Sequence, residues 1–265
     1  MQYKWKVVPP CREQRLDIRP EDMLPGGVFR VCDVYKSGGG YDKFPSIYKA
    51  KTGKGVDPRQ FVVQLYGCHL ECPYCYVTPN GVWGDYEEYT SEEMVKEFLL
   101  AREYTQTDIR TFHLMGGSPG LYIEYWPELI GMLDNYGSFV FHSDLTLTEK
   151  RLNRPLLQAI SQPNCLYAVN VKGVDRYDYK RNTGKEFDSG MFWLNLYDLW
   201  IMDVPFYLTF TNPNPEGYED FCRRVEETMN ESILKHAFTI DLKEYDAVKA
   251  YEVTHCGRIT GVPLL

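Results

Sequence analysis

The sequence predicts an α/β protein whose parallel strands form a partial (β/α)6 barrel. From residue 60 to residue 242, short apolar runs of strand length alternate with longer stretches of helical periodicity. Such alternation indicates a parallel sheet with right-handed crossovers. Six strand–helix units, rather than eight, predict a barrel that stays open on one side. Functional groups are then expected at the carboxyl ends of the strands.

Each expected element carries a local signal. The strands are apolar runs at residues 60–67, 111–117, 138–147, 165–173, 205–212 and 237–242. The helices are expected at residues 90–104, 127–137, 149–160, 191–201 and 218–229. Thr90 and Glu93 have the spacing of a capping box, Gly137 follows the end of the second helix, and Pro155 predicts a kink in the third.

The chain divides into two parts by pattern. Residues 1–59 show no sustained period and are expected to form an N-terminal extension that packs on the barrel. Residues 60–265 are expected to hold the partial barrel and a C-terminal tail.

The composition is that of a globular chain that binds neither nucleic acid nor an anionic membrane surface. The 265 residues carry a formal net charge of −8, and Lys and Arg do not gather in one block. No apolar run reaches the roughly 18 residues of a membrane span. The first 20 residues lack the pattern of a secretory signal. We therefore expect a cytoplasmic protein with reduced thiols.

Three of the eight cysteines, Cys68, Cys72 and Cys75, fall within one loop directly after the first expected strand. Their spacing, Cys-x3-Cys-x2-Cys, favours metal binding over disulfides. Thiolates are soft ligands, and three of them suit three irons of a [4Fe–4S] cluster, which leaves one iron open to another ligand. A tetrahedral zinc site with His69 as the fourth ligand is the alternative, although adjacent residues of an extended turn point apart.

The segment CHLECPYC, with Tyr74 directly before its third cysteine, resembles the signature loop of the radical S-adenosylmethionine superfamily. The segment MGGSPG at 115–120 is similar to the Gly-Gly-Glu-Pro motif of that superfamily and ends the second expected strand. The order of elements matches over roughly residues 60–242. The resemblance implies two cofactors, a [4Fe–4S] cluster at the carboxyl ends of the strands and S-adenosylmethionine.

The resemblance also implies an activity. The open iron would bind the amino and carboxylate groups of S-adenosylmethionine. One electron, from a donor such as a flavodoxin or a ferredoxin, would break a carbon–sulfur bond and give methionine and a 5′-deoxyadenosyl radical. The radical would take a hydrogen atom from the substrate, while the protein orients the reactive carbon and excludes water and oxygen.

The resemblance assigns roles to residues of both motifs. The three cysteines would ligate the cluster. Tyr74 would lie beside the adenine, or, as the alternative, would only pack under the loop. Gly116 and Gly117 would offer carbonyl groups to the methionine ammonium group, although Gly-Gly-Ser-Pro-Gly also makes an ordinary turn.

Ser118 departs from the motif, because the superfamily has Glu there and a serine hydroxyl brings no charge. Either the backbone suffices, or another acid compensates, and Asp144 at the end of the third expected strand is the candidate. His142, on the same strand, could face the ribose or the methionine, or be an ordinary residue of the strand end.

The stretch NVKGVDRYDYKRNTGKE, residues 170–186, resembles the Asp-x-Lys … Thr-Gly stretch of the glycyl-radical-enzyme activases, with Asn170 in place of Asp. Lys172 would pair with the methionine carboxylate, although a lysine at a strand end can also face solvent. Thr211, at the end of the fifth expected strand, could reach the ribose or the methionine.

The activase resemblance implies a protein or peptide substrate. A small-molecule substrate is the alternative within the superfamily. Outside it, the alternative is a zinc- or cluster-binding structural or regulatory module without chemistry.

Overall fold

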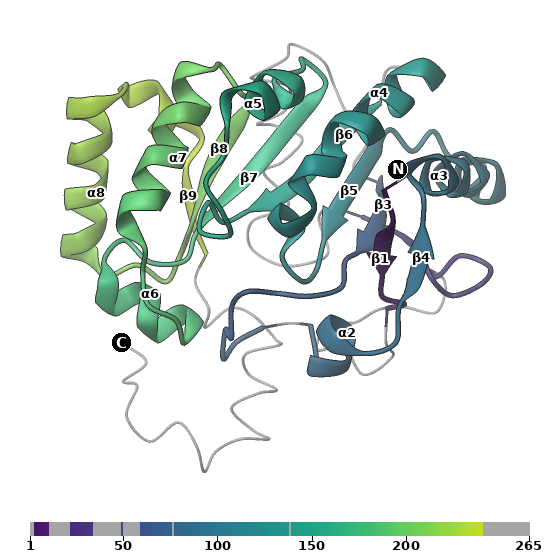
Figure 1. Cartoon of the computed structure of the whole chain (residues 1–265), viewed down its shortest axis with the longest axis horizontal. Helices are drawn as coiled ribbons and strands as arrows, with labels where there is room; N and C mark the ends of the chain where they lie inside the picture. The colour runs from purple at the N-terminus through teal and green to yellow at the C-terminus, as the bar shows by residue number, and fades with distance from the viewer. Residues whose placement is uncertain are drawn as a thin grey trace.

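The computed structural model describes residues 3–10, 22–33, 49, 59–75, 77–137 and 139–240. In these residues, parallel strands lie side by side in chain order (Figure 1): β3 (Arg59–Gln64), β5 (Thr111–Met115), β6 (Val140–Leu145), β7 (Cys165–Val171), β8 (Phe206–Thr211) and β9 (Phe238–Ile240). Strand β2 (Arg30–Asp33) pairs antiparallel with β3 at one edge, and β9 forms the other edge. The predicted α/β fold with a mostly parallel sheet is confirmed.

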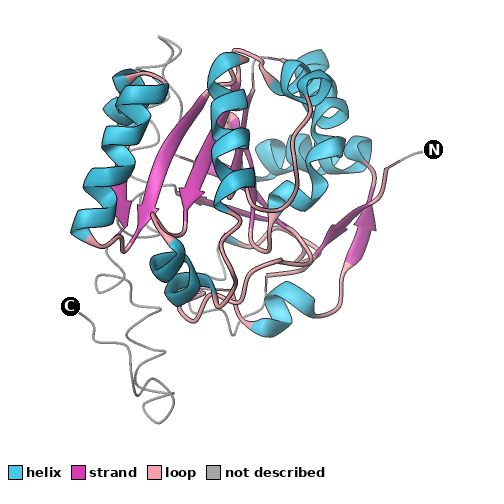
Figure 2. Ribbon diagram, turned by 60° about the vertical axis from the view of Figure 1, so that its left-hand side comes forward, coloured by secondary structure: helices cyan, strands magenta, loops and turns pink. Residues whose placement is uncertain are grey.

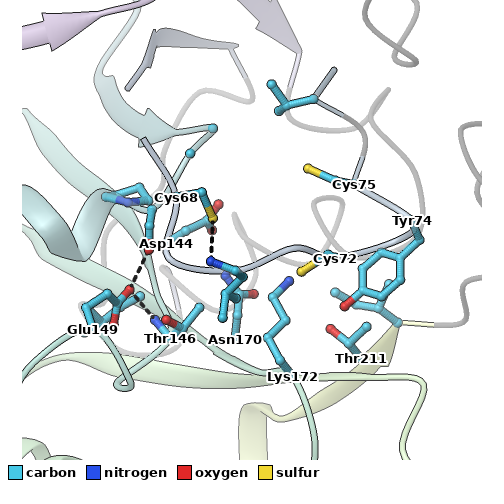
Figure 3. A pocket seen from close by; sticks show the side chains of 18 residues that line it. Cys68, Cys72, Tyr74, Cys75, Asp144, Thr146, Glu149, Asn170, Lys172 and Thr211 are labelled. Atoms are coloured by element: carbon cyan, nitrogen blue, oxygen red, sulfur yellow. Dashed lines mark hydrogen bonds between the residues drawn. The ribbon is translucent and has the colours of Figure 1, made fainter. Parts of the chain in front are cut away.

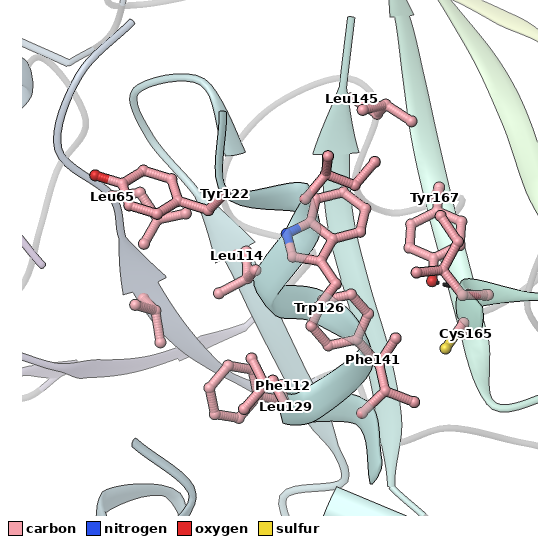
Figure 4. Packing of buried hydrophobic residues seen from close by; sticks show 14 of the residues in the cluster. Leu65, Phe112, Leu114, Tyr122, Trp126, Leu129, Phe141, Leu145, Cys165 and Tyr167 are labelled. Atoms are coloured by element: carbon pink, nitrogen blue, oxygen red, sulfur yellow. Dashed lines mark hydrogen bonds between the residues drawn. The ribbon is translucent and has the colours of Figure 1, made fainter. Parts of the chain in front are cut away.

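Helices cover one face of this sheet (Figures 1 and 2): α3 (Ser91–Thr105), α4 (Trp126–Tyr136), α5 (Arg154–Ile160), α7 (Ser189–Ile201) and α8 (Pro215–Thr228). Aromatic side chains fill the layer between helices and sheet. Phe98 of α3 packs edge-on against Phe112 of β5, with ring centroids 5.6 Å apart. Trp126 of α4 stacks on Tyr167 of β7 at 5.3 Å (Figure 4). This apolar layer is the main core, and it fixes the strands whose carboxyl ends bear the predicted site.

The predicted capping box begins α3. Glu93 N donates to Thr90 Oγ1 at 3.1 Å, and Thr90 N donates to Glu93 Oε2 at 2.7 Å. Helix α4 ends at Tyr136, and Gly137 follows it at the C-cap, as predicted.

The prediction for the third helix was wrong in its first turn. Helix α5 begins at Arg154 rather than at residue 149, and Pro155 lies in its first turn instead of kinking it. Leu156 N donates to Asn153 Oδ1 at 3.0 Å, so Asn153 caps the helix. A proline in the first turn of a helix has no intrahelical hydrogen bond to lose. Asn153 followed by Pro155 therefore marks the start of a helix. Residues 146–153, which we call the β6–α5 loop, therefore lie outside any helix.

Several short elements were not predicted: β1 (Trp5–Val7), α2 (Pro79–Trp83), β4 (Glu87–Tyr89), η4 (Pro119–Tyr125), α6 (Arg176–Thr183) and η5 (Glu231–His236). Strand β1 pairs with β4, and Trp5 Nε1 donates to Ser91 Oγ at 3.0 Å. The described parts of the N-terminal extension thus pair with strands of the rest of the chain. Residues 241 and 242 of the last expected strand, and the C-terminal tail, lie outside the described residues.

Across the part of the chain that the structure describes, no helix is both long and apolar enough to cross a membrane.

Candidate functional site

The loop after β3 carries the three clustered cysteines and is fixed on both sides by backbone hydrogen bonds. Ser118 N donates to Gly67 O at 2.8 Å, which ties the start of the loop to the turn after β5. Glu71 N donates to Thr183 O at 2.9 Å, which ties its middle to the end of α6. The cysteines therefore sit in a braced loop at the carboxyl ends of the strands.

Cys68, Cys72 and Cys75 line one cavity (Figure 3). Its atom-free space is about 900 Å³, with the open solvent at the mouth included. None of the three forms a disulfide. Burial raises the pKa of the Cys68 thiol to about 12, so metal binding there must displace a proton.

Eleven of the twelve residues singled out from the sequence line this cavity. They are Cys68, Cys72, Tyr74, Cys75, Gly116, Gly117, Ser118, Asp144, Asn170, Lys172 and Thr211. The exception is His142. Its buried ring lies on the sheet between His113 and Tyr207, 4.2 Å from the His113 centroid, with Nε2 3.1 Å from Tyr207 Oη.

The cavity fits an iron–sulfur cluster better than a zinc ion. Among the described residues, no three His, Cys, Asp or Glu side chains are arranged to hold one metal ion. His69, the fourth ligand of the zinc alternative, is hydrogen-bonded at both ring nitrogens, with Nδ1 2.8 Å from Ser118 Oγ and Nε2 3.0 Å from Thr148 Oγ1. Thiols spread around a cavity suit a cluster, in which each thiolate binds a different iron.

Two buried hydroxyls meet in the cavity. Those of Tyr74 and Thr211 make no hydrogen bond of good geometry within the described structure, although Tyr74 interacts with both Thr211 and Cys72, and both side chains point into the cavity (Figure 3). Burying an unpaired hydroxyl is unfavourable. The pair therefore indicates a polar ligand beside the cysteine loop.

The glycine turn after β5 is required by the backbone around it. Gly116 and Gly117 have φ of +71° and +56°, which side chains disfavour. A Cβ on Gly117 would lie 2.4 Å from both Gly67 O and Leu65 O. These glycines therefore let the end of β5 press against the cysteine loop, and both also face the cavity.

Charged groups come from the ends of the next strands. Burial raises the pKa of Asp144 to about 6, although Lys172 and Asn170 act in the opposite direction. Lys172 Nζ lies 5.8 Å from the centroid of the Tyr74 ring. Thr209 Oγ1 donates to Asn170 Oδ1 at 2.6 Å, which orients that amide at the end of β7.

Sequence reasoning missed two polar residues of the cavity wall, Thr146 and Glu149. Both belong to the β6–α5 loop, whose second half had been assigned to a helix. The combination of Asn153 with Pro155 is the signal that could have corrected this, because it marks a helix start.

The β6–α5 loop is held by one buried side chain of α7. Asn195 Nδ2 donates to Leu147 O at 2.9 Å and to Lys150 O at 2.8 Å, and Asn195 Oδ1 accepts from Leu152 N at 3.0 Å. Asn195 thus spans the backbone on both sides of Glu149.

Comparison with protein-family models matches residues 62–192 to the Radical SAM superfamily. The chain belongs to this superfamily. The matched segment runs from β3 into α7 and contains the cysteine loop, the glycine turn and Lys172. Enzymes of this superfamily use a [4Fe–4S] cluster and S-adenosylmethionine. The match is to the superfamily as a whole and does not single out the activases.

Three solved structures illustrate the likeness of the fold. They are native anSMEcpe with bound AdoMet and Cp18Cys peptide (16% identity, TM-score 0.46), Streptococcus suis SuiB bound to precursor peptide SuiA (11%, 0.45), and TYW1 with a lysine-pyruvate adduct bound (17%, 0.47). The alignments cover 66%, 66% and 77% of this chain, and 48%, 47% and 75% of those chains. The chain thus spans about half the length of anSMEcpe and SuiB. No curated protein matches its sequence.

Proposed function

We propose that this protein holds a [4Fe–4S] cluster with Cys68, Cys72 and Cys75, binds S-adenosylmethionine beside it, and abstracts a hydrogen atom from a protein or peptide substrate. When bound, these cofactors supply the electron and the 5′-deoxyadenosyl radical for that abstraction. The observation that carries the proposal is the meeting of three thiols, the glycine turn and the charged ends of two further strands at one cavity.

The protein's own groups suit a ligand with a charged end and a polar sugar. Lys172 is a cation for a carboxylate, because an ammonium group donates strong hydrogen bonds to it. The buried hydroxyls of Tyr74 and Thr211 are donors and acceptors for ribose or adenine. Leu70 and Val77 add apolar wall, which keeps water away from the reacting atoms.

The proposal of a protein or peptide substrate depends on the activase-like stretch 170–186. In the fold, this stretch runs from the end of β7 through α6. Asn182 Nδ2 donates to Lys172 O at 2.8 Å and to Thr211 O at 2.9 Å. The stretch therefore both presents Lys172 and braces the neighbouring strand ends, which supports its use in shaping the cavity.

Cofactor chemistry is tested first. Protein reconstituted without oxygen should bind about four irons per chain, and addition of dithionite and S-adenosylmethionine should yield 5′-deoxyadenosine. A colourless protein that binds one zinc and yields no nucleoside would contradict the proposal and favour the structural module.

The substrate is tested by tracing hydrogen. Candidate proteins, peptides and small molecules carrying deuterium are incubated with the reduced enzyme, and 5′-deoxyadenosine is analysed by mass spectrometry. Deuterium arriving from a protein or peptide supports the proposed substrate class, whereas transfer only from a small molecule would establish the alternative.

A further inference from the structure

The turn after β5 holds a serine against a glutamate from another strand end. Ser118 Oγ donates to Glu149 Oε1 at 3.0 Å, although the two residues are 31 positions apart. Ser118 is only 2% exposed, and both residues line the cavity. Figure 3 shows Glu149 in the cavity wall. The serine that replaces the glutamate of the motif is therefore in direct contact with a carboxylate.

The Glu149 carboxylate is positioned by several independent contacts. Thr146 N donates a hydrogen bond to Glu149 Oε1 at 3.4 Å. Thr148 N donates one to Glu149 Oε2 at 3.1 Å. A Cβ on Gly120 would lie 2.7 Å from both Cδ and Oε1 of Glu149. Since Gly120 does not have a positive φ, the need for glycine there is one of space. The last glycine of Gly-Gly-Ser-Pro-Gly leaves the room that this carboxylate occupies.

No lysine or arginine among the described residues forms an ion pair with Glu149, although His69 lies near enough to interact with its carboxylate. The neighbouring Lys150 pairs with Glu124 instead, and Lys185 pairs with Glu71. A carboxylate that receives neutral hydrogen bonds and faces a ligand cavity is suited to a positively charged ligand group.

We propose that Glu149, oriented by Ser118, accepts a hydrogen bond from the α-amino group of S-adenosylmethionine. The inference rests on the proposed function and names the group that replaces the missing carboxylate of the motif. The amino nitrogen, with its lone pair on the open iron, keeps two N–H donors for a carboxylate, whereas the sulfonium centre offers none. Lys172 supplies the opposite charge in the same cavity, for the carboxylate of the ligand. The sequence made Asp144 the candidate for the acid that replaces the glutamate of the motif. In the structure, Ser118 donates its hydrogen bond to Glu149.

The test is the dissociation constant of S-adenosylmethionine for the reconstituted, unreduced enzyme, measured by equilibrium dialysis. Glu149→Gln keeps the shape and removes the charge, and should weaken binding roughly 10- to 100-fold. Gly120→Ala keeps the charge but displaces it, and should weaken binding about tenfold. Glu227→Gln is the matched control, because it removes the same charge from an exposed position of α8, outside the cavity wall. It should leave the dissociation constant unchanged.

A second ligand isolates the amino group. Because the open iron also binds this group, both enzymes should bind an analogue that lacks it more weakly than S-adenosylmethionine. The ratio of the two dissociation constants should nevertheless be roughly 10- to 100-fold larger for wild type than for Glu149→Gln. Equal binding of both ligands by wild type, or full discrimination by a Glu149→Gln enzyme with wild-type iron content, would overturn the inference. A wild-type enzyme that binds neither ligand would instead overturn the proposed function.

Discussion

Two adjoining parts of the cavity wall are built in different ways. The cysteine loop and the glycine turn, at the ends of β3 and β5, are set by backbone geometry, since Gly117 packs against the carbonyl groups of Leu65 and Gly67. The β6–α5 loop is set by side chains, with Asn195 bridging its backbone and Asn153 capping the helix that follows.

The contrast teaches which parts of such a site leave a pattern in a sequence. A cluster needs three thiols at defined spacing, and a tight turn needs residues that tolerate positive φ, so both appear as short motifs. A single charge can reach a cavity from any nearby loop that is held in place. Glu149 therefore has no motif of its own, and only Ser118 and Gly120 mark its position.

The largest expected effect lies in the first part of the wall. Replacing Cys68, Cys72 or Cys75 with serine should abolish cluster binding, because the loop then offers two thiolates. Iron content and 5′-deoxyadenosine yield are the measurements. Cys222→Ser, in the half-buried middle of α8, is the control and should retain the cluster. Retention of full iron content by any of the three variants would show that the replaced cysteine is not a cluster ligand.

The glycine turn should give the next largest effect. Gly117→Ala combines a positive φ with a Cβ 2.4 Å from two carbonyl oxygens. It should lower the free energy of unfolding by about 4 kcal/mol, since strain and overpacking add. Urea unfolding of the cluster-free protein measures this. Gly131→Ala in α4 meets nothing within 4 Å and should be neutral or slightly stabilising. Equal effects of the two substitutions would show that the turn is not constrained as described.

In the second part of the wall, Asn195→Ala should cost about 3 kcal/mol of unfolding free energy, because it leaves Leu152 N and two buried carbonyl groups without their partner. Asn153→Ala, which removes only a helix cap, should cost about 1 kcal/mol. The same unfolding measurement compares them. If Asn195→Ala proved the milder of the two, the loop would be held by contacts other than those of Asn195.

The smallest expected effect is a pH dependence from Asp144. Its pKa of about 6 in the folded protein exceeds the ordinary value of 3.8, so the folded state retains a proton that the unfolded chain has lost. Stability therefore falls as pH rises between about 4 and 6. Relative to wild type, Asp144→Asn should gain on the order of 2 kcal/mol between pH 4 and pH 7.

The control for that comparison is Gly131→Ala, which adds a methyl group on α4 and changes no titratable group. Its difference from wild type should stay constant over the same pH range, as measured by urea unfolding of cluster-free protein. A constant difference for Asp144→Asn as well would mean that Asp144 is not buried enough to hold its proton.

The sequence alone was enough to predict the repeating strand–helix units of the fold. Apolar runs revealed each parallel strand because strands covered by helices need continuous apolar side chains. Strands β1 and β2 escaped notice, since three or four residues carry no period and their partners are distant in the chain. Glu149 was missed because the predicted helix began at residue 149, whereas α5 begins at Arg154 and leaves Glu149 in a loop.

The central claim is that the cysteine triplet holds a [4Fe–4S] cluster open to S-adenosylmethionine. The most direct test is the electron paramagnetic resonance spectrum of the reconstituted, dithionite-reduced protein, recorded with and without S-adenosylmethionine. The account predicts the signal of a reduced four-iron cluster whose g-values change when S-adenosylmethionine is added. A cluster signal that is identical in both samples at saturating ligand, or no cluster signal at all, would contradict it.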